Sequence, residues 1–233
     1  MKTLLWYKRH IPSGVAMSET EQSNRFWQDC VPKSFIYDEY CSDAVETMIN
    51  VQRKRHKAVT DPEQMEPVFW VAEDCMGSGE LSKCKHARRV FTNGRQWRIF
   101  ALLSLQYVTD LPPKFRGQVD YVFAYRALAE DDREKLYQYF FSGAFSSYGD
   151  FLQVLKACTS DYHCLVLDAT KPTNKLDEQV FWWKAPPAPE FKAGSKEFWQ
   201  FHLMNFKDDD EDDDMQDPLA NRRHRQLKVK MLK

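Results

Sequence analysis

The chain has 233 residues, 43% of them hydrophobic, which is enough for one sizeable α/β domain with a tail. Its 33 basic and 34 acidic residues nearly cancel, so the overall charge does not indicate a nucleic-acid-binding protein. No apolar run approaches the length of a membrane span, and the apolar segment at the N-terminus is too short for a signal peptide. The six cysteines follow no zinc-ligand spacing, which is typical of reduced thiols in an intracellular protein.

The first part of the chain alternates between short strand-like and helix-like segments. Residues 14–18 (Gly-Val-Ala-Met-Ser) are predicted to form a buried strand, and residues 35–37 (Phe-Ile-Tyr) are predicted to form another short strand. A helix with Ser42 at its N-cap is predicted next, because apolar residues recur from Val45 at the i, i+3 and i+4 spacing of a buried helix face.

The far end of that helix is strongly basic, since residues 53–57 read Arg-Lys-Arg-His-Lys. Basic residues in a last helical turn complement the macrodipole and usually lie on a solvated face. The second interpretation, a patch that contacts a phosphate backbone, remains open.

The centre of the chain is an apolar strand that ends in acid. Residues 68–72 (Val-Phe-Trp-Val-Ala) are fully apolar, as in a parallel strand that helices cover on both faces, and Glu73 and Asp74 follow directly. A carboxylate pair at the carboxyl end of such a strand lies where open α/β sheets bind their ligands.

Two further strands are predicted to end in polar groups near this pair. Residues 97–105 lead into Gln106, and residues 120–125 lead into Arg126. Between them an exposed-looking turn, Pro-Pro-Lys-Phe-Arg, ends in Arg116. Acid, amide and guanidinium groups are therefore expected to converge on one phosphate and metal chemistry.

The rest of the core continues the alternation. Two helices are predicted after Arg126, followed by a buried strand at residues 164–167 that ends in Asp168 and a last strand at residues 180–183. Strands that alternate with helices predict an α/β core over residues 1–185, with a mostly parallel sheet covered by helices.

Residues 186–233 differ from this core. A Pro-rich exit is followed by seven consecutive acids at residues 208–214, and the last twelve residues carry six Lys or Arg. Such charge blocks are usually flexible and could pair with each other, or the basic end could bind DNA or another partner.

An apolar strand followed by two acids has the pattern of a Walker B motif. In such sites one carboxylate holds Mg²⁺ and the next polarises the attacking water. A Gln at the end of the neighbouring strand suits a group that senses the γ-phosphate, and an exposed Arg suits a finger that reaches the phosphate of an adjacent subunit.

Several further motifs resemble one family. They are Asn-Gly-Arg at 93–95, Leu-Gln-Tyr at 105–107, the Leu-Pro-Pro-Lys-Phe-Arg run at 111–116, and Asp-Tyr-Val-Phe at 120–123. With the segments at 17–21, 35–38, 158–159, 164–168, 173–178 and 180–182, they resemble the genome-packaging ATPases of large nucleocytoplasmic DNA viruses, the poxvirus-like members of the FtsK–HerA superfamily. The resemblance covers residues 11–185, and the Gln, Pro-Pro, Arg and Asp-Tyr block is specific.

This resemblance implies a RecA-like P-loop NTPase core that assembles into a ring and uses ATP and Mg²⁺ to pump double-stranded DNA into a capsid. It implies that Glu73 and Asp74 are the Walker B acids and Mg-ATP ligands, Gln106 the polar sensor, and Arg116 the finger. It also implies viral capsid or membrane-associated packaging components as partners, and a location in the host cytoplasm, at the viral factory, or in the virion. No residue is assigned to DNA contact.

Two departures from the family pattern bear on activity. The chain contains no G-x-x-x-x-G-K-[ST] loop, so the first strand and the phosphate loop of such a core are expected to be missing. Glu73 also stands where the family has Asp, and its extra methylene would shift the metal. We therefore expect this chain alone to bind ATP weakly or not at all and to be inactive or very weakly active.

Three interpretations remain open. In the first, the chain is a DNA-packaging ATPase shortened at its N-terminus. In the second, it is a degenerate ring subunit that has lost hydrolysis and serves as a structural or DNA-binding partner. The third is an unrelated α/β protein with a coincidental acidic strand. In that last case Gln106 and Arg116 should lie far from Glu73.

Overall fold

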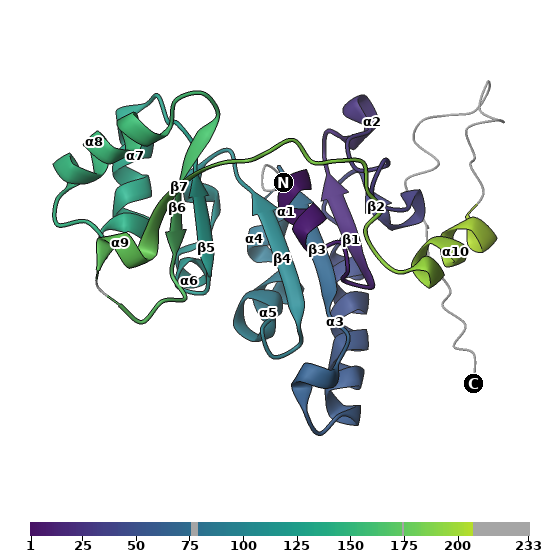
Figure 1. Cartoon of the computed structure of the whole chain (residues 1–233). Helices are drawn as coiled ribbons and strands as arrows, with labels where there is room; N and C mark the ends of the chain where they lie inside the picture. The colour runs from purple at the N-terminus through teal and green to yellow at the C-terminus, as the bar shows by residue number, and fades with distance from the viewer. Residues whose placement is uncertain (76–78, 174, 207–233) are drawn as a thin grey trace.

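The computed structural model describes residues 1–75, 79–173 and 175–206, and within them two β-sheets (Figure 1). The larger sheet is parallel throughout, with its strands in the order β2 (Ile36–Tyr37), β1 (Ser13–Ser18), β3 (Val68–Glu73) and β4 (Ile99–Ser104). The smaller sheet is antiparallel, in the order β5 (Tyr121–Ala124), β6 (His163–Asp168) and β7 (Val180–Lys184).

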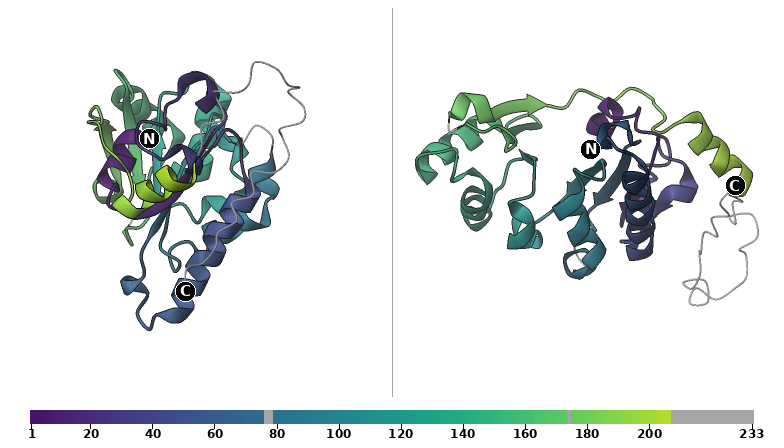
Figure 2. Two further views of the ribbon diagram at one scale, coloured as in Figure 1. Left: turned by 90° about the vertical axis from the view of Figure 1, so that its right-hand side faces the viewer. Right: turned by 90° about the horizontal axis from the view of Figure 1, so that it is seen from below.

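Helices cover both faces of the parallel sheet (Figure 2). One face packs against α3 (Ser42–Ala58), α4 (Glu80–Lys83), α5 (Lys85–Asn93) and α6 (Pro113–Arg116). The other face packs against α1 (Lys2–Tyr7), the segment that follows α2 (Glu21–Asn24) in the chain, and α10 (Lys196–Asn205). Ser42 was predicted to be the N-cap of α3. In the structure Ser42 is the first residue of this helix, and Cys41 is its N-cap.

The side chains of β3 alternate between these two layers. Val68, Trp70 and Ala72 point toward α3 and α5, and Phe69 and Val71 point toward α1 and α10. All five are buried, which explains why the strand shows no polar alternation. Burial of each large apolar side chain in this strand contributes about 1.5–3 kcal/mol to folding.

Gly14 in β1 is required by this packing. A Cβ at position 14 would lie 2.3 Å from Cγ of Phe69 and 2.3 Å from the carbonyl oxygen of Phe69. No side chain fits between the two strands at this point.

The smaller sheet is covered on one face by three helical segments: α7 (Glu130–Leu136), the π-helix η4 (Tyr137–Phe141) and α8 (Tyr148–Cys158). Leu165 and Leu167 of β6 pack there against Phe141 and Phe151. The remaining short helices are η1 (Lys33–Phe35), η2 (Pro62–Gln64), η3 (Val108–Asp110) and α9 (Leu176–Gln179).

The prediction of an α/β fold with a parallel sheet covered by helices is confirmed for the strands up to Ser104. The three later strands do not extend that sheet, and this part of the prediction is wrong. Residues 169–179, which join β6 to β7, are fewer than the dozen or more that a parallel crossover needs, so β7 returns antiparallel. Apolar content predicted these strands but carries no information on their direction.

Residues of the C-terminal region pack on the larger sheet as far as residue 206. Phe198 of α10 lies with its ring centroid 4.4 Å from that of Phe35 and 6.3 Å from that of Phe69. The acidic run at 208–214 and the basic end of the chain lie outside the described residues.

Candidate functional site

Three parallel strands end together at the carboxyl edge of the larger sheet. Ser18 of β1 pairs in register with Glu73 of β3, and Glu73 pairs with Ser104 of β4. The last residue of each strand is therefore polar, and the three are adjacent across the sheet. We refer to this edge and the residues that follow it as the carboxyl edge.

Glu73 is held at the carboxyl edge by two donors. Its Oε2 accepts a hydrogen bond from Ser18 Oγ at 3.0 Å and another from the Trp27 indole Nε1 at 2.8 Å. Trp27 is completely buried, so its ring cannot follow a moving carboxylate. The carboxylate is thus fixed in orientation, and among the described residues its Oε1 has no hydrogen-bond partner.

Asp74 leaves the strand in a left-handed conformation, with φ of 53°. Asp tolerates this region better than most residues, at a cost of about 1–2 kcal/mol. Its Oδ1 lies 3.4 Å from Ser104 Oγ on the neighbouring strand. The turn therefore places a second carboxylate at the carboxyl edge, on the side of β4.

Glu21 is a third acid in this neighbourhood, and it is buried. It accepts hydrogen bonds from the backbone N–H of Trp27 at 3.0 Å and of Gln28 at 3.2 Å. Burial raises the pKa of Glu21 above its ordinary value, the two backbone donors oppose this, and the charge of Glu73 adds to it. Trp27 thus binds both acids, Glu21 through its backbone and Glu73 through its indole.

The amino group of Met1 also lies within electrostatic reach of Glu73. Burial lowers the pKa of this amine, and the negative charge of Glu73 partly restores it. The N-terminal end of α1 is therefore directed to the carboxyl edge. The first two side chains of the helix are engaged elsewhere, since Lys2 Nζ contacts Asp29 at 3.0 Å and Thr3 Oγ1 donates to the Pro186 carbonyl at 2.9 Å.

Gln106 follows β4 by two residues and is exposed at the same end of the sheet as Glu73 and Asp74. Within the described part of the chain its side chain makes no hydrogen bond. The three residues predicted to share one edge are thus on that edge, although no direct contact joins Gln106 to the acids.

Arg116 does not reach the carboxyl edge. It ends α6, where its Nε donates to the Leu111 carbonyl at 2.9 Å and its guanidinium carbon lies 3.4 Å from the ring centroid of Tyr139. The expectation of an exposed side chain is wrong, because this stacking leaves Arg116 half-buried.

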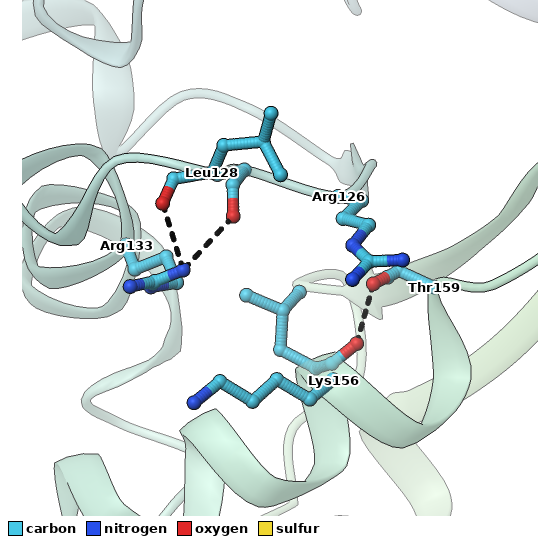
Figure 3. A pocket seen from close by; sticks show the side chains of 7 residues that line it. Arg126, Leu128, Arg133, Lys156 and Thr159 are labelled. Carbon is cyan, nitrogen blue, oxygen red and sulfur yellow. Dashed lines mark hydrogen bonds between the residues drawn. The ribbon is translucent and has the colours of Figure 1, made fainter.

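Arg126 also lies apart from the acids, because β5 belongs to the antiparallel sheet. It lines a separate pocket of about 180 Å³ together with Arg133, Lys156 and Thr159 (Figure 3). Arg133 is engaged by the carbonyl oxygens of Ala127 and Leu128, at 3.3 and 2.9 Å. The predicted convergence of acid, amide and guanidinium on one site is therefore wrong for Arg126.

Sequence patterns had not predicted Ser18, Trp27, Glu21 or Ser104 as members of this site. Ser18 carried a usable signal, since it ends a predicted strand as Glu73 does, but its neighbour in the sheet depends on strand order. Among the described residues no three His, Cys, Asp or Glu side chains are grouped to hold a metal ion. A helix of sufficient length and apolar character to cross a membrane is likewise not found among those residues.

The fold and this edge define a parallel α/β protein with an acid pair at the carboxyl end of a central strand. No family model matches the sequence. Protein 075L of Invertebrate iridescent virus 6 is 30% identical over 212 residues, which cover 89% of this chain and 81% of that protein. The chain belongs to the same family as this viral protein.

Protein 015R of Frog virus 3 is 32% identical over 86% of this chain and 62% of its own length. The chain thus spans less than two thirds of that relative. Other relatives occur in Invertebrate iridescent virus 3 and Acanthamoeba polyphaga mimivirus, so the predicted relationship to proteins of large DNA viruses is confirmed.

Among solved structures, the chain is similar to the genome packaging NTPase B204 from Sulfolobus turreted icosahedral virus 2 in complex with ATP-γ-S. That similarity covers 80% of this chain and 88% of the other, at 12% identity and a TM-score of 0.49.

Proposed function

We propose that this chain is part of an ATP-driven motor that translocates double-stranded DNA during genome packaging of a large DNA virus. The observation that carries the proposal is the carboxyl edge, where Glu73 and Asp74 end a buried parallel strand beside Ser104 and Gln106. Ligands of open α/β sheets bind at this position.

The residues at the edge fit a magnesium ion. Mg²⁺ in nucleotide sites keeps several waters and needs only one or two carboxylates from the protein. Glu73 offers its Oε1 and Asp74 its carboxylate, and the bonds from Ser18 and Trp27 hold the first of these in place. Bound there, the ion would neutralise charge that develops on a transferring phosphoryl group.

The edge does not supply a full cradle for the triphosphate. The chain has no glycine-rich loop with a lysine, and Lys2, at the start of α1, is engaged by Asp29. Backbone N–H groups and lysine provide most of the positive charge that β- and γ-phosphates require. We therefore infer that this chain contributes the metal and water side of an ATPase site and that phosphate-binding groups must come from elsewhere.

The unpaired side of β4 supports a location for the missing phosphate-binding groups. Within the described residues β4 pairs on one side only, although its sequence Ile-Phe-Ala-Leu-Leu-Ser is that of a buried strand. Open apolar edges are rare in stable proteins because they recruit further strands. A strand paired to β4 and running parallel to it would end at the carboxyl edge, where α1 begins.

In this proposal Glu73 holds the metal, and Asp74 beside it polarises the attacking water and takes its proton as it reacts. Gln106 orients that water from the neighbouring strand. Arg116 would act on an adjacent subunit, which requires its stack on Tyr139 to open. The acids, the amide and the arginine are thus assigned different steps of one hydrolysis.

The test is nucleotide binding and hydrolysis with and without an added phosphate loop. The chain of 233 residues should show no micromolar binding of ATP with Mg²⁺. A chain extended ahead of Met1 by a strand and a G-x-x-x-x-G-K-[ST] loop should bind and hydrolyse ATP. Asp74→Asn in the extended chain should abolish hydrolysis and leave ATP binding. Micromolar binding by the shorter chain, or an inactive extended chain that folds, would contradict the proposal.

One observation favours a second function, a ring subunit that binds DNA or supports the ring without hydrolysis. Glu73 already accepts two hydrogen bonds on Oε2, and this arrangement stabilises the acid without any metal. Reading the coding DNA upstream of Met1 separates the two functions. An in-frame strand and phosphate loop favour the ATPase, and a stop codon without such a loop favours the inactive subunit.

A further inference from the structure

Seven exposed cations gather over the helices that cover one face of the larger sheet. We call this surface the basic face. Its members come from α3, α4 and α5, which are separate in sequence: Arg53, Lys54, Lys57, Lys83, Lys85, Arg88 and Arg89.

The structure brings these helices side by side (Figures 1 and 2). His86 Nε2 of α5 lies 3.5 Å from Glu46 Oε2 of α3, which aligns the start of α5 with the first third of α3. Both helices return from one strand to the next parallel one, so they run in the same direction. With a rise of 1.5 Å per residue, the cations extend from Lys85 to Lys57 over roughly 18 Å.

None of the seven side chains has an ion pair or hydrogen bond among the described residues. On other surfaces cations are commonly paired, as Lys2 is with Asp29, Lys135 with Asp131 and Lys184 with Asp161. The basic face is therefore charged without compensation from the part of the chain that the structure describes.

Helix stability does not account for this charge. The macrodipole explains basic residues in the last turn of α3, but Lys85 is the first residue of α5, whose first turn has no acid. Lys85 and Arg89 also stand at i and i+4, where like charges destabilise a helix by about 0.2–0.5 kcal/mol. The arrangement therefore opposes the fold slightly, as a surface built for an external anion does.

We propose that the basic face binds the phosphate backbone of double-stranded DNA. Duplex DNA carries one charge per roughly 1.7 Å of axis, so a strip of about 18 Å faces many phosphates at once. Within the described residues the face exposes no aromatic side chain, which single-stranded DNA would need for base stacking and a membrane surface for insertion. The choice of DNA rests on the proposed function, whereas the existence of an anion-binding face does not.

The test is the salt dependence of duplex binding, measured by fluorescence anisotropy with the full chain and without nucleotide. The variant Arg53→Gln/Lys57→Gln/Arg88→Gln/Arg89→Gln should bind a labelled duplex at least about tenfold more weakly at low salt. The slope of log K against log salt should become shallower by about 0.9 for each phosphate contact that is lost. The melting temperature of this four-residue variant should be equal to or higher than that of the wild type, because like charges have been removed.

A matched control removes four cations from α7, from β7 and from the connection between β6 and β7: Lys135→Gln, Lys171→Gln, Lys175→Gln and Lys184→Gln. This variant has the same net charge as the first, so an unchanged slope would show that position matters and not total charge. A third variant, Arg222→Gln/Arg223→Gln/Arg225→Gln, addresses the basic end of the chain.

Three results would overturn the proposal. They are equal loss in the control, loss confined to the Arg222 variant, or loss of binding to anionic vesicles in the basic-face variant with duplex binding intact. Because no nucleotide is present, a failure of ATP hydrolysis with intact duplex binding would concern the proposed function alone.

Discussion

The indole N–H of Trp27 donates to Glu73 at 2.8 Å, although the two residues are 46 positions apart in the chain. One is a fully buried tryptophan in the segment that follows α2, and the other is the last residue of β3. The bond joins the core to the carboxyl edge, so stability and site geometry are coupled there.

Removing this donor should reveal that coupling. Trp27→Phe keeps an aromatic ring but leaves Glu73 with Ser18 alone, and we expect the free energy of unfolding to fall by about 1–3 kcal/mol. In a double-mutant cycle with Glu73→Gln, measured by urea unfolding, the two substitutions should couple by about 1 kcal/mol or more. Trp199→Phe, which loses a bond to the Ala193 carbonyl, is the matched control and should be additive with Glu73→Gln.

Glu21 predicts a pH dependence of stability. Burial raises its folded pKa above the ordinary 4.5, so the folded state holds the proton more tightly than the unfolded state. Stability contributed by this group is present below the unfolded pKa and is lost as pH rises through the folded pKa. Relative to Glu21→Gln, the wild-type protein should therefore lose stability as pH increases above about 4.5.

The measurement is urea unfolding of both proteins across that pH range. Glu19→Gln, at an exposed acid two residues away, is the control and should track the wild type. A constant difference between wild type and Glu21→Gln at all pH values would refute the assignment of a raised pKa.

Gly14 tests the packing between β1 and β3. Gly14→Ala places a Cβ 2.3 Å from the ring of Phe69, and the forced shift should lower the free energy of unfolding by about 1–3 kcal/mol. Gly117→Ala, where an added Cβ meets no atom within 4 Å, should be neutral or slightly stabilising. Thermal unfolding distinguishes the two, and equal melting temperatures would mean that the strands are less closely packed than described.

Arg116 combines a hydrogen bond with a cation–π stack. Arg116→Ala should lower the free energy of unfolding by about 1–2 kcal/mol, because the bond to Leu111 and the stack on Tyr139 are both lost. Arg116→Lys should recover only part of this, since an ammonium group lacks the planar fork. The control is Gln118→Ala, at an exposed neighbour. If Arg116→Ala leaves the free energy of unfolding unchanged, Arg116 is instead free to act on another subunit.

Local pattern was sufficient for much of the site. The apolar run at 68–72 predicted a buried strand that ends in two acids. In the structure Glu73 is the last residue of β3, and Asp74 follows it directly. The same reasoning located the strand that precedes Gln106. Both inferences use only the spacing of apolar side chains and the change from apolar to polar residues at the strand end. Both signals lie within a few consecutive residues.

What the sequence by itself determined is thus the existence of the strands, the acid pair and the charge of each helix. Only the tertiary structure decided that β5, β6 and β7 form a separate antiparallel sheet, that Arg116 stacks on Tyr139, and that Trp27 holds Glu73. It also decided that the cations of α5 join those of α3 on one face. The physical reason is that strand direction and contacts between distant side chains depend on how whole elements pack, and no local period records that packing.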